Sequence, residues 1–232
     1  MNEEVYISFP CPHCGSIVDY VEDYAETLQP CPYCTEDLIV PARTGEEGGK
    51  LGLPIETPRL ILRRLELEDF SDAVEILTDP ETFHYEERDA WSEDGVKRWL
   101  EEEVKSRLSD EKGKLVLAVI QQDDHKLIGL LWLSFSKPNR QEVEVLLQIN
   151  TSRRRQGFGS EALQAALSFC FEDVRLHRVT SVCATRDIAS MRLLAKSGMR
   201  REAECVKDRF IDGEWTNSSW HAMLEEEFFG KT

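Results

Sequence analysis

Two pairs of cysteines near the start of the chain have a spacing that could bind a metal ion. Cys11 and Cys14 form one Cys-x-x-Cys pair, Cys31 and Cys34 form a second, and sixteen residues separate the two pairs. Two thiolates three positions apart on a tight turn can occupy two corners of a tetrahedron, and a second such turn supplies the other two. Because four thiolates leave no open coordination position, the pattern predicts a structural zinc ion and not a catalytic one.

The alternatives for these cysteines are two disulfides or a redox pair. The acidic start of the chain has no basic segment with an apolar run behind it, so no secretory signal is predicted and cytoplasm is the expected location. Cysteines there stay reduced, which favours metal. Because so small a module cannot form a sufficient hydrophobic core, the metal would supply the missing free energy of folding. We expect a zinc ribbon over residues 1–41, with a short hairpin over 17–24, and a Gly-rich linker over 42–55.

The second candidate site is a basic, glycine-containing loop between an expected strand and an expected helix. It reads Arg-Arg-Arg-Gln-Gly-Phe-Gly over residues 153–159. Glycines let backbone N–H groups approach an anion, and the start of a helix adds the positive end of its dipole. The loop lacks the Gly-Lys-Ser/Thr of a P-loop and the third glycine of the dinucleotide fingerprint. It therefore predicts an anion-binding site of another kind.

The elements around this loop alternate between strand and helix signals from residue 57 onwards, which predicts an α/β or α+β domain. Strands are expected at 60–65, 114–120, 127–135, 142–149 and 178–183, and helices at 69–77, 160–174 and 189–196. Ser92 is expected to cap a further helix, and Asp212-Gly213 to turn a hairpin between two final strands. Trp132, Trp215 and Trp220 fall in strands, where core packing is favoured over lining an acceptor pocket.

The loop resembles a signature of the GNAT N-acetyltransferase superfamily, R/Q-x-x-G-x-G/A, which wraps the pyrophosphate of coenzyme A in that family. Its positions are held here by Arg154, Arg155, Gln156, Gly157, Phe158 and Gly159. Segments 57–63, 159–162 and 187–199 are similar to the ribosomal-protein N-terminal acetyltransferase (Rim-type) branch. The resemblance spans about residues 56–228. It implies an α+β GNAT fold over 56–232, with a mixed, mostly antiparallel central sheet flanked by helices.

The resemblance also implies roles for single residues. The loop would hold the pyrophosphate of the cosubstrate acetyl-CoA through backbone N–H groups, and backbone groups of Leu147 and Ile149 would line the pantetheine arm. Glu144 stands at the place of the general base, and Ser190 at the place of the hydroxyl that protonates the leaving thiolate. Asp187 replaces the usual Asn and cannot donate when ionised, which would weaken its contact with the pantetheine.

These roles have structural alternatives. Glu144 could be a strand residue on a wet face, and Ser190 could serve only to cap or back-bond its helix. The enzyme hypothesis itself competes with a non-catalytic zinc-ribbon adaptor that binds coenzyme A. The first hypothesis predicts turnover with some amine, whereas the second predicts binding of coenzyme A without turnover.

The implied reaction is acetyl transfer to a primary amine, first of all the N-terminal α-amine of a protein. The net charge of 28 − 44 = −16 disfavours nucleic acid and suits cationic ligands, so a polyamine or another small cationic amine is the alternative acceptor. The longest apolar runs are too short to span a bilayer, so no membrane partner is expected. The sequence leaves the oligomeric state open, a homodimer included.

Overall fold

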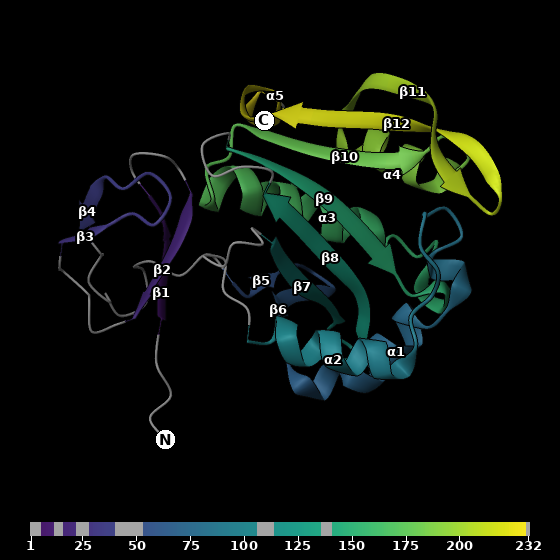
Figure 1. Cartoon of the computed structure of the whole chain (residues 1–232), viewed down its shortest axis with the longest axis horizontal. Coiled ribbons are helices and arrows are strands. Elements are labelled where there is room, and N and C mark those ends of the chain that lie inside the picture. The colour runs from purple at the N-terminus through teal and green to yellow at the C-terminus, as the bar shows by residue number, and fades with distance from the viewer. Residues whose placement is uncertain are drawn as a thin grey trace.

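An eight-stranded, mostly antiparallel sheet is the centre of the larger domain in this computed structural model (Figure 1). The structure describes residues 6–11, 16–21, 28–39, 53–105, 114–135 and 141–230. The spatial order of its strands is β11 (Arg200–Ile211), β12 (Glu214–Leu224), β10 (Arg178–Ala184), β9 (Glu142–Ile149), β8 (Leu127–Phe135), β7 (Lys114–Gln121), β6 (Leu60–Arg64) and β5 (Ile55–Glu56). Only the pair β9–β10 is parallel among these described strands. This sheet confirms the expected fold class.

Helices cover both faces of the sheet and create two separate cores. The helices are α1 (Phe70–Leu77) and α2 (Glu93–Glu103) on one face, and α3 (Phe158–Ser168) and α4 (Ile188–Ser197) on the other, with α5 (Glu225–Phe229) after β12. Strand β7 separates the two cores, because Leu115, Leu117 and Val119 pack on the α3 side and Val116 and Ala118 on the α1 side. Its unbroken apolar run therefore reflects burial on both faces. None of the helices described combines the length and apolar character that a membrane-spanning helix needs.

The expected elements occur with small shifts at their ends. The expected cap is confirmed, since the Ser92 hydroxyl accepts a hydrogen bond from Gly95 N at 3.2 Å. The final hairpin is confirmed too, with left-handed backbone at Asp212 and Gly213. The helix expected at 160–174 begins two residues earlier, at Phe158, and after Ser168 it continues as a π-helical turn over Phe169–Asp173.

The parallel strands β9 and β10 pair over only three residues, from Arg178 opposite Glu142 to Thr180 opposite Glu144. Beyond that point each strand continues without pairing with the other, so the two diverge. We call the space between residues 145–149 and 181–184 the wedge. Such divergence leaves backbone N–H and C=O groups without strand partners, and these groups must bond to side chains, water or a ligand.

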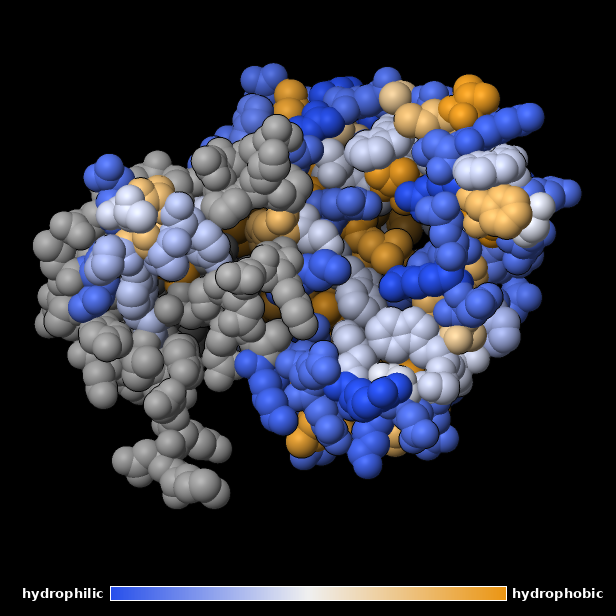
Figure 2. All heavy atoms as spheres, in the orientation of Figure 1, coloured by the Kyte–Doolittle hydropathy of each residue, from blue (hydrophilic) through white to orange (hydrophobic). Residues whose placement is uncertain are grey.

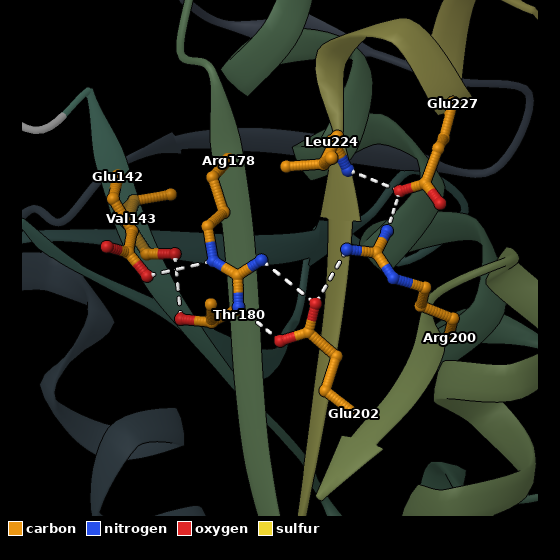
Figure 3. Close-up of polar contacts among 8 residues, drawn as sticks. All are labelled: Glu142, Val143, Arg178, Thr180, Arg200, Glu202, Leu224 and Glu227. Atoms are coloured by element: carbon orange, nitrogen blue, oxygen red, sulfur yellow. Dashed lines mark hydrogen bonds and ion pairs between the residues drawn. The ribbon is translucent and has the colours of Figure 1, made fainter.

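A chain of ion pairs crosses the closed end of the wedge (Figure 3). Arg178 Nε lies 3.1 Å from Glu142 Oε1 on β9, and the same guanidinium contacts Glu202 on β11. Arg200 bonds Glu202 at 2.6 Å and also contacts Glu227 of α5. The hydrogen bond from Arg178 lowers the pKa of Glu202. These contacts tie three strands and a helix together where β9 and β10 begin to separate.

Replacing Arg178 with methionine should therefore lower the free energy of unfolding by about 1–3 kcal/mol, because Glu142 and Glu202 lose their shared partner while three-quarters buried. Urea denaturation followed by circular dichroism measures this change. Arg186→Met is the matched control: its pair with Glu214 is exposed, so the expected loss is below about 0.5 kcal/mol. Equal losses in the two variants would contradict a structural role for the chain of ion pairs.

The N-terminal module contains two short hairpins, β1 (Tyr6–Pro10) with β2 (Ile17–Val21) and β3 (Leu28–Pro30) with β4 (Asp37–Ile39). Within the segment 17–24, where a short hairpin was expected, β2 pairs antiparallel with the preceding strand β1, and residues 22–24 lie outside the described residues. Residues 40–52, which include most of the expected linker, lie outside the described residues.

Candidate active site

A pocket of about 770 Å³ opens at the wedge, and Figure 2 shows the hollow on this face of the larger domain. Its walls come from β9, β10, the loop before α3 and the start of that helix, α4, the connection between α1 and α2, and Arg209 of β11. Nine of the predicted site residues line it: Glu144, Leu147, Ile149, Arg154, Arg155, Gly157, Gly159, Asp187 and Ser190. Two predicted residues do not, since Gln156 is exposed and Phe158 is buried in the core.

The basic loop presents the start of α3 to this pocket. Left-handed backbone at Arg155 (φ 62°) and Gly157 (φ 87°) turns the chain into the helix. The helix's first backbone bond joins Glu161 N to Gly157 O at 3.1 Å, so the N–H groups just before Glu161 have no partner within the helix. Unshared N–H groups and the positive end of the helix dipole make this a binding position for an anion such as a diphosphate.

A contact that the sequence did not reveal holds this loop in place. Arg59 donates from Nη1 to Gln156 O at 2.9 Å and from Nε to Glu161 Oε2 at 2.7 Å, and its guanidinium lies 4.7 Å from the centre of the Phe158 ring. Burial opposes ionisation of Glu161, but hydrogen bonds from Thr57 and Arg59 outweigh it and keep the pKa of Glu161 below its usual value. Both segments had been noted as motifs, but about one hundred residues separate them in the chain.

The backbone of β9 faces the wedge at the residues expected to line a pantetheine arm. Asn150 N bonds Ile128 O on the β8 side, whereas Val145 O accepts from Ser181 Oγ across the wedge at 2.8 Å. Strand backbone groups alternate in direction, so Leu147 and Ile149 also direct their N–H and C=O groups towards the wedge. Arg154 Nε already donates to Ile149 O at 3.1 Å, which ties the loop to the strand.

The two residues expected to move protons line the pocket from different elements, Glu144 from β9 and Ser190 from α4. Glu144 is exposed at the point where β9 and β10 cease to pair, and no described residue bonds its carboxylate. Ser190 lies in the first turn of α4, and its hydroxyl has no partner among the described residues. Asp187 caps that helix by accepting from Ser190 N at 2.9 Å, so capping falls to the aspartate and not to the serine.

The connection between α1 and α2 forms a wall that the sequence did not predict. Gln148 joins Trp132 to this wall, because its Oε1 accepts from Trp132 Nε1 at 3.1 Å and its Nε2 donates to Glu86 Oε1 at 2.8 Å. Trp132 packs half-buried against the α2 side, as expected, but core packing is wrong for Trp215 and Trp220, which are 60% and 41% exposed.

The described cysteines of the N-terminal module gather at one point. The sulfur atoms of Cys11, Cys31 and Cys34 all lie within 4.8 Å of one another, and those of Cys11 and Cys34 are 3.8 Å apart. Each turn starts in the same way, with Cys11 N bonded to Ser16 O and Cys31 N to Glu36 O. Cys14, the fourth predicted ligand, lies outside the described residues. The three sulfurs fit one face of a thiolate tetrahedron.

The anion-binding helix start and the two diverging strands form the arrangement that the resemblance to the GNAT superfamily implied. The comparisons with known proteins agree. The profile of the acetyltransferase (GNAT) domain matches residues 59–200. The uncharacterized N-acetyltransferase YnaD of Bacillus subtilis is 31% identical over 176 residues, which are 75% of this chain and 98% of that protein. The chain therefore belongs to the GNAT acetyltransferase family and is an acyltransferase that uses acetyl-CoA.

Solved structures share the fold. An acetyltransferase (GNAT family) from Bacillus anthracis aligns with a TM-score of 0.67 at 25% identity, over 75% of this chain and 99% of that one. A spermidine N-acetyltransferase from Vibrio cholerae, solved with CoA and spermine, aligns with a TM-score of 0.66 over the same shares. Its identity is 20%, so that likeness shows the fold alone.

Replacing Arg59 with methionine should weaken acetyl-CoA binding about tenfold, because the loop carbonyl at Gln156 and the Glu161 carboxylate lose their common donor. Calorimetric titration measures the dissociation constant. Lys126→Met removes a cation paired with Asp72 elsewhere on the surface and serves as the control, with unchanged affinity. An unchanged dissociation constant in Arg59→Met would mean that the loop keeps its shape without this support.

Proposed function

We propose that this enzyme transfers the acetyl group of acetyl-CoA to the N-terminal α-amine of a protein, as enzymes of the Rim-type branch do. The observation that carries the proposal is the single pocket that joins the anion-binding loop to Glu144 through the wedge. A donor bound with its diphosphate at the loop would reach into the wedge, and its thioester would then lie between Glu144 and Ser190.

Binding of the donor would use backbone groups for the most part. The loop from Arg154 to Gly159 would hold the diphosphate through its N–H groups, and Leu147 and Ile149 would bond the pantetheine amides from β9. Asp187 accepts but cannot donate, and its bond to Ser190 N already occupies one oxygen. We therefore assign Asp187 chiefly to positioning the first turn of α4, where it fixes Ser190.

Proton transfer would fall to Glu144 and Ser190. An amine attacks only when neutral, and an α-amine with a pKa of about 7.7–8.0 is deprotonated far more readily than lysine at about 10.4. Glu144 is exposed to the pocket and has no partner among the described residues, so it can accept that proton directly or through water. Wedge-facing backbone N–H groups could stabilise the tetrahedral oxyanion, and the Ser190 hydroxyl could protonate the leaving thiolate.

The N-terminal module would be a structural zinc ribbon over residues 1–41, joined by a linker over 42–55 to the acetyltransferase domain over 56–232. The clustered sulfurs of Cys11, Cys31 and Cys34 support this assignment, with Cys14 as the fourth ligand. Four thiolates would saturate the ion, so it would hold the ribbon together and take no part in acetyl transfer.

A polyamine is the second candidate acceptor, favoured by the net charge of −16 and by Glu81, Glu86 and Glu144 in the pocket wall. Radiolabelled acetyl-CoA offered with N-terminal peptides and with spermidine separates the two. We expect kcat/KM to be higher for the peptides. Preference for spermidine would replace the first proposal with the second, and binding of acetyl-CoA with no turnover of any amine would support a non-catalytic adaptor.

A further inference from the structure

Arg209 of β11 lines the pocket at its α1 side. Its side chain is half-buried, yet no described residue forms an ion pair or hydrogen bond with its guanidinium. Three nearby arginines do form ion pairs with glutamates: Arg200 and Arg201 on β11, and Arg186 between β10 and α4. A half-buried guanidinium is stabilised most by a carboxylate or a phosphate, because either group can accept two parallel hydrogen bonds from its planar N–H donors.

The fold fixes where this guanidinium lies. A bulge between Cys205 and Arg209 shifts the register of β11 against β12, with left-handed backbone at Lys207. Bulges of this kind re-aim side chains beside active sites. After the bulge, Arg209 pairs with Thr216, two residues before Ser218, which pairs with Ala184 at the end of β10. Arg209 therefore lies at the open end of the wedge.

Two contacts hold the hairpin beside Arg209 against the connection between α1 and α2. Phe210 N donates to Glu87 Oε1 at 3.0 Å, and Asp212 lies 3.9 Å from His84 Nδ1. That connection belongs to the α1 face of the sheet, whereas the anion-binding loop opens α3 on the other face. Arg209 thus reaches the pocket from the α1 side, whereas the anion-binding helix start reaches it from the α3 side. Under the proposed function the donor's diphosphate takes the helix start, which leaves Arg209 to the acceptor.

We propose that Arg209 binds a carboxylate of the acceptor, so that the enzyme selects primary amines that carry an acidic group a few bonds from the reacting nitrogen. The inference rests on the proposed function and names its substrate class. Glu144 would bind the amine and Arg209 would bind the carboxylate. The two side chains together would thus match an acceptor that carries both an ammonium and a carboxylate group. The carboxylate can come from an acidic side chain near a protein N-terminus or from the α-carboxylate of a free amino acid.

Matched acceptors test this charge preference. We compare kcat/KM of the full-length enzyme for three pairs of acceptors. The first pair is two amidated peptides that differ only by Asp or Asn at the first residue, and the second pair differs in the same way at the second residue. The third pair is glycine and glycinamide. We expect the acidic member of at least one pair to be preferred by about 10- to 100-fold, the strength of a charged hydrogen-bonded contact. The preferred pair identifies the source of the carboxylate.

Two variants assign the preference to Arg209. Arg209→Gln should bring the acid-to-amide ratio close to one, whereas Lys207→Gln, which removes a cation from the same bulge outside the pocket, should retain the wild-type ratio. Calorimetry with acetyl-CoA should give similar dissociation constants for wild type and Arg209→Gln.

Three outcomes would overturn the inference. The first is an acid-to-amide ratio of kcat/KM near one for wild-type enzyme in every pair. The second is a ratio that stays at the wild-type value in Arg209→Gln. The third is a loss of the preference in that variant that weaker acetyl-CoA binding explains. In each of these cases amines are still acetylated, so the proposed function stands. If wild-type enzyme binds acetyl-CoA but acetylates none of the acceptors, the proposed function fails and the inference fails with it.

Discussion

Glutamine in place of Glu144 should lower kcat by about 10²–10⁴-fold at pH 7 while the dissociation constant for acetyl-CoA changes by less than about twofold. The amide has nearly the same size and leaves the register of β9 against β8 and β10 intact, but it cannot take a proton from the acceptor's ammonium group to produce the neutral amine that attacks. Steady-state kinetics with the best peptide, together with calorimetry, separate the chemical defect from a binding defect.

The pH dependence makes this expectation more specific. An α-amine with a pKa of about 7.7–8.0 is mostly neutral in solution at pH 9.5, so the need for a base declines and the defect of Glu144→Gln should shrink there. Glu142→Gln is the matched control, because Glu142 lies two residues earlier on the same face but bonds Arg178 at the closed end of the wedge. Wild-type kcat in Glu144→Gln, or an equal loss in Glu142→Gln, would remove Glu144 from the mechanism.

The order of elements and the anion-binding loop could be predicted because both are local properties. Alternation of side chains identified the strands, glycines and arginines identified the loop, and Ser92 identified the start of α2. The support for the loop was not local: Arg59 and Glu161 lie about one hundred residues apart. Nothing in the neighbourhood of either residue indicates that they meet, because the meeting follows from β6 and α3 packing side by side.

Exposure was harder to predict than secondary structure. Trp215 and Trp220 lie in a strand, as expected, but a strand pattern does not say whether each face of the sheet is covered. The hairpin of β11 and β12 ends the sheet, and its tip extends beyond β10, so Trp215 stays exposed. Its ring lies tilted against that of Phe210, with the ring centres 5.3 Å apart. Arg209 escaped prediction for a similar reason, because a bulge sets its direction and nothing in the sequence signals that bulge.

Removing the proposed zinc ion should unfold the N-terminal module and leave the acetyltransferase domain folded. The buried residues described in this module are Cys11, Val18 and Cys31 alone, and two of these are predicted zinc ligands. Burying a side chain such as Val18 gives about 1.5–3 kcal/mol, whereas ordering each residue's backbone costs about 1–2 kcal/mol. A structural zinc ion contributes about 10–16 kcal/mol of folding free energy in zinc-finger peptides, several times the contribution of one buried valine.

The sulfur geometry separates this account from disulfides. Bonded sulfurs lie about 2.05 Å apart, whereas thiolates about 2.3 Å from a common tetrahedral ion lie about 3.8 Å from one another. The separation of Cys11 and Cys34 sulfurs is 3.8 Å. Native mass spectrometry should therefore find one zinc per chain, lost in Cys31→Ser but kept in Cys205→Ser, whose cysteine lies on β11 in the other domain.

Chelation then tests the energetic claim. Two-dimensional amide spectra should lose the dispersed signals of the N-terminal module when a strong chelator removes the zinc, while the signals of the larger domain and the affinity for acetyl-CoA persist. Signals of both domains that stay dispersed without metal would show that the module folds on its own contacts. A chain isolated with no zinc and with non-reactive thiols at Cys11 and Cys34 would instead favour disulfides.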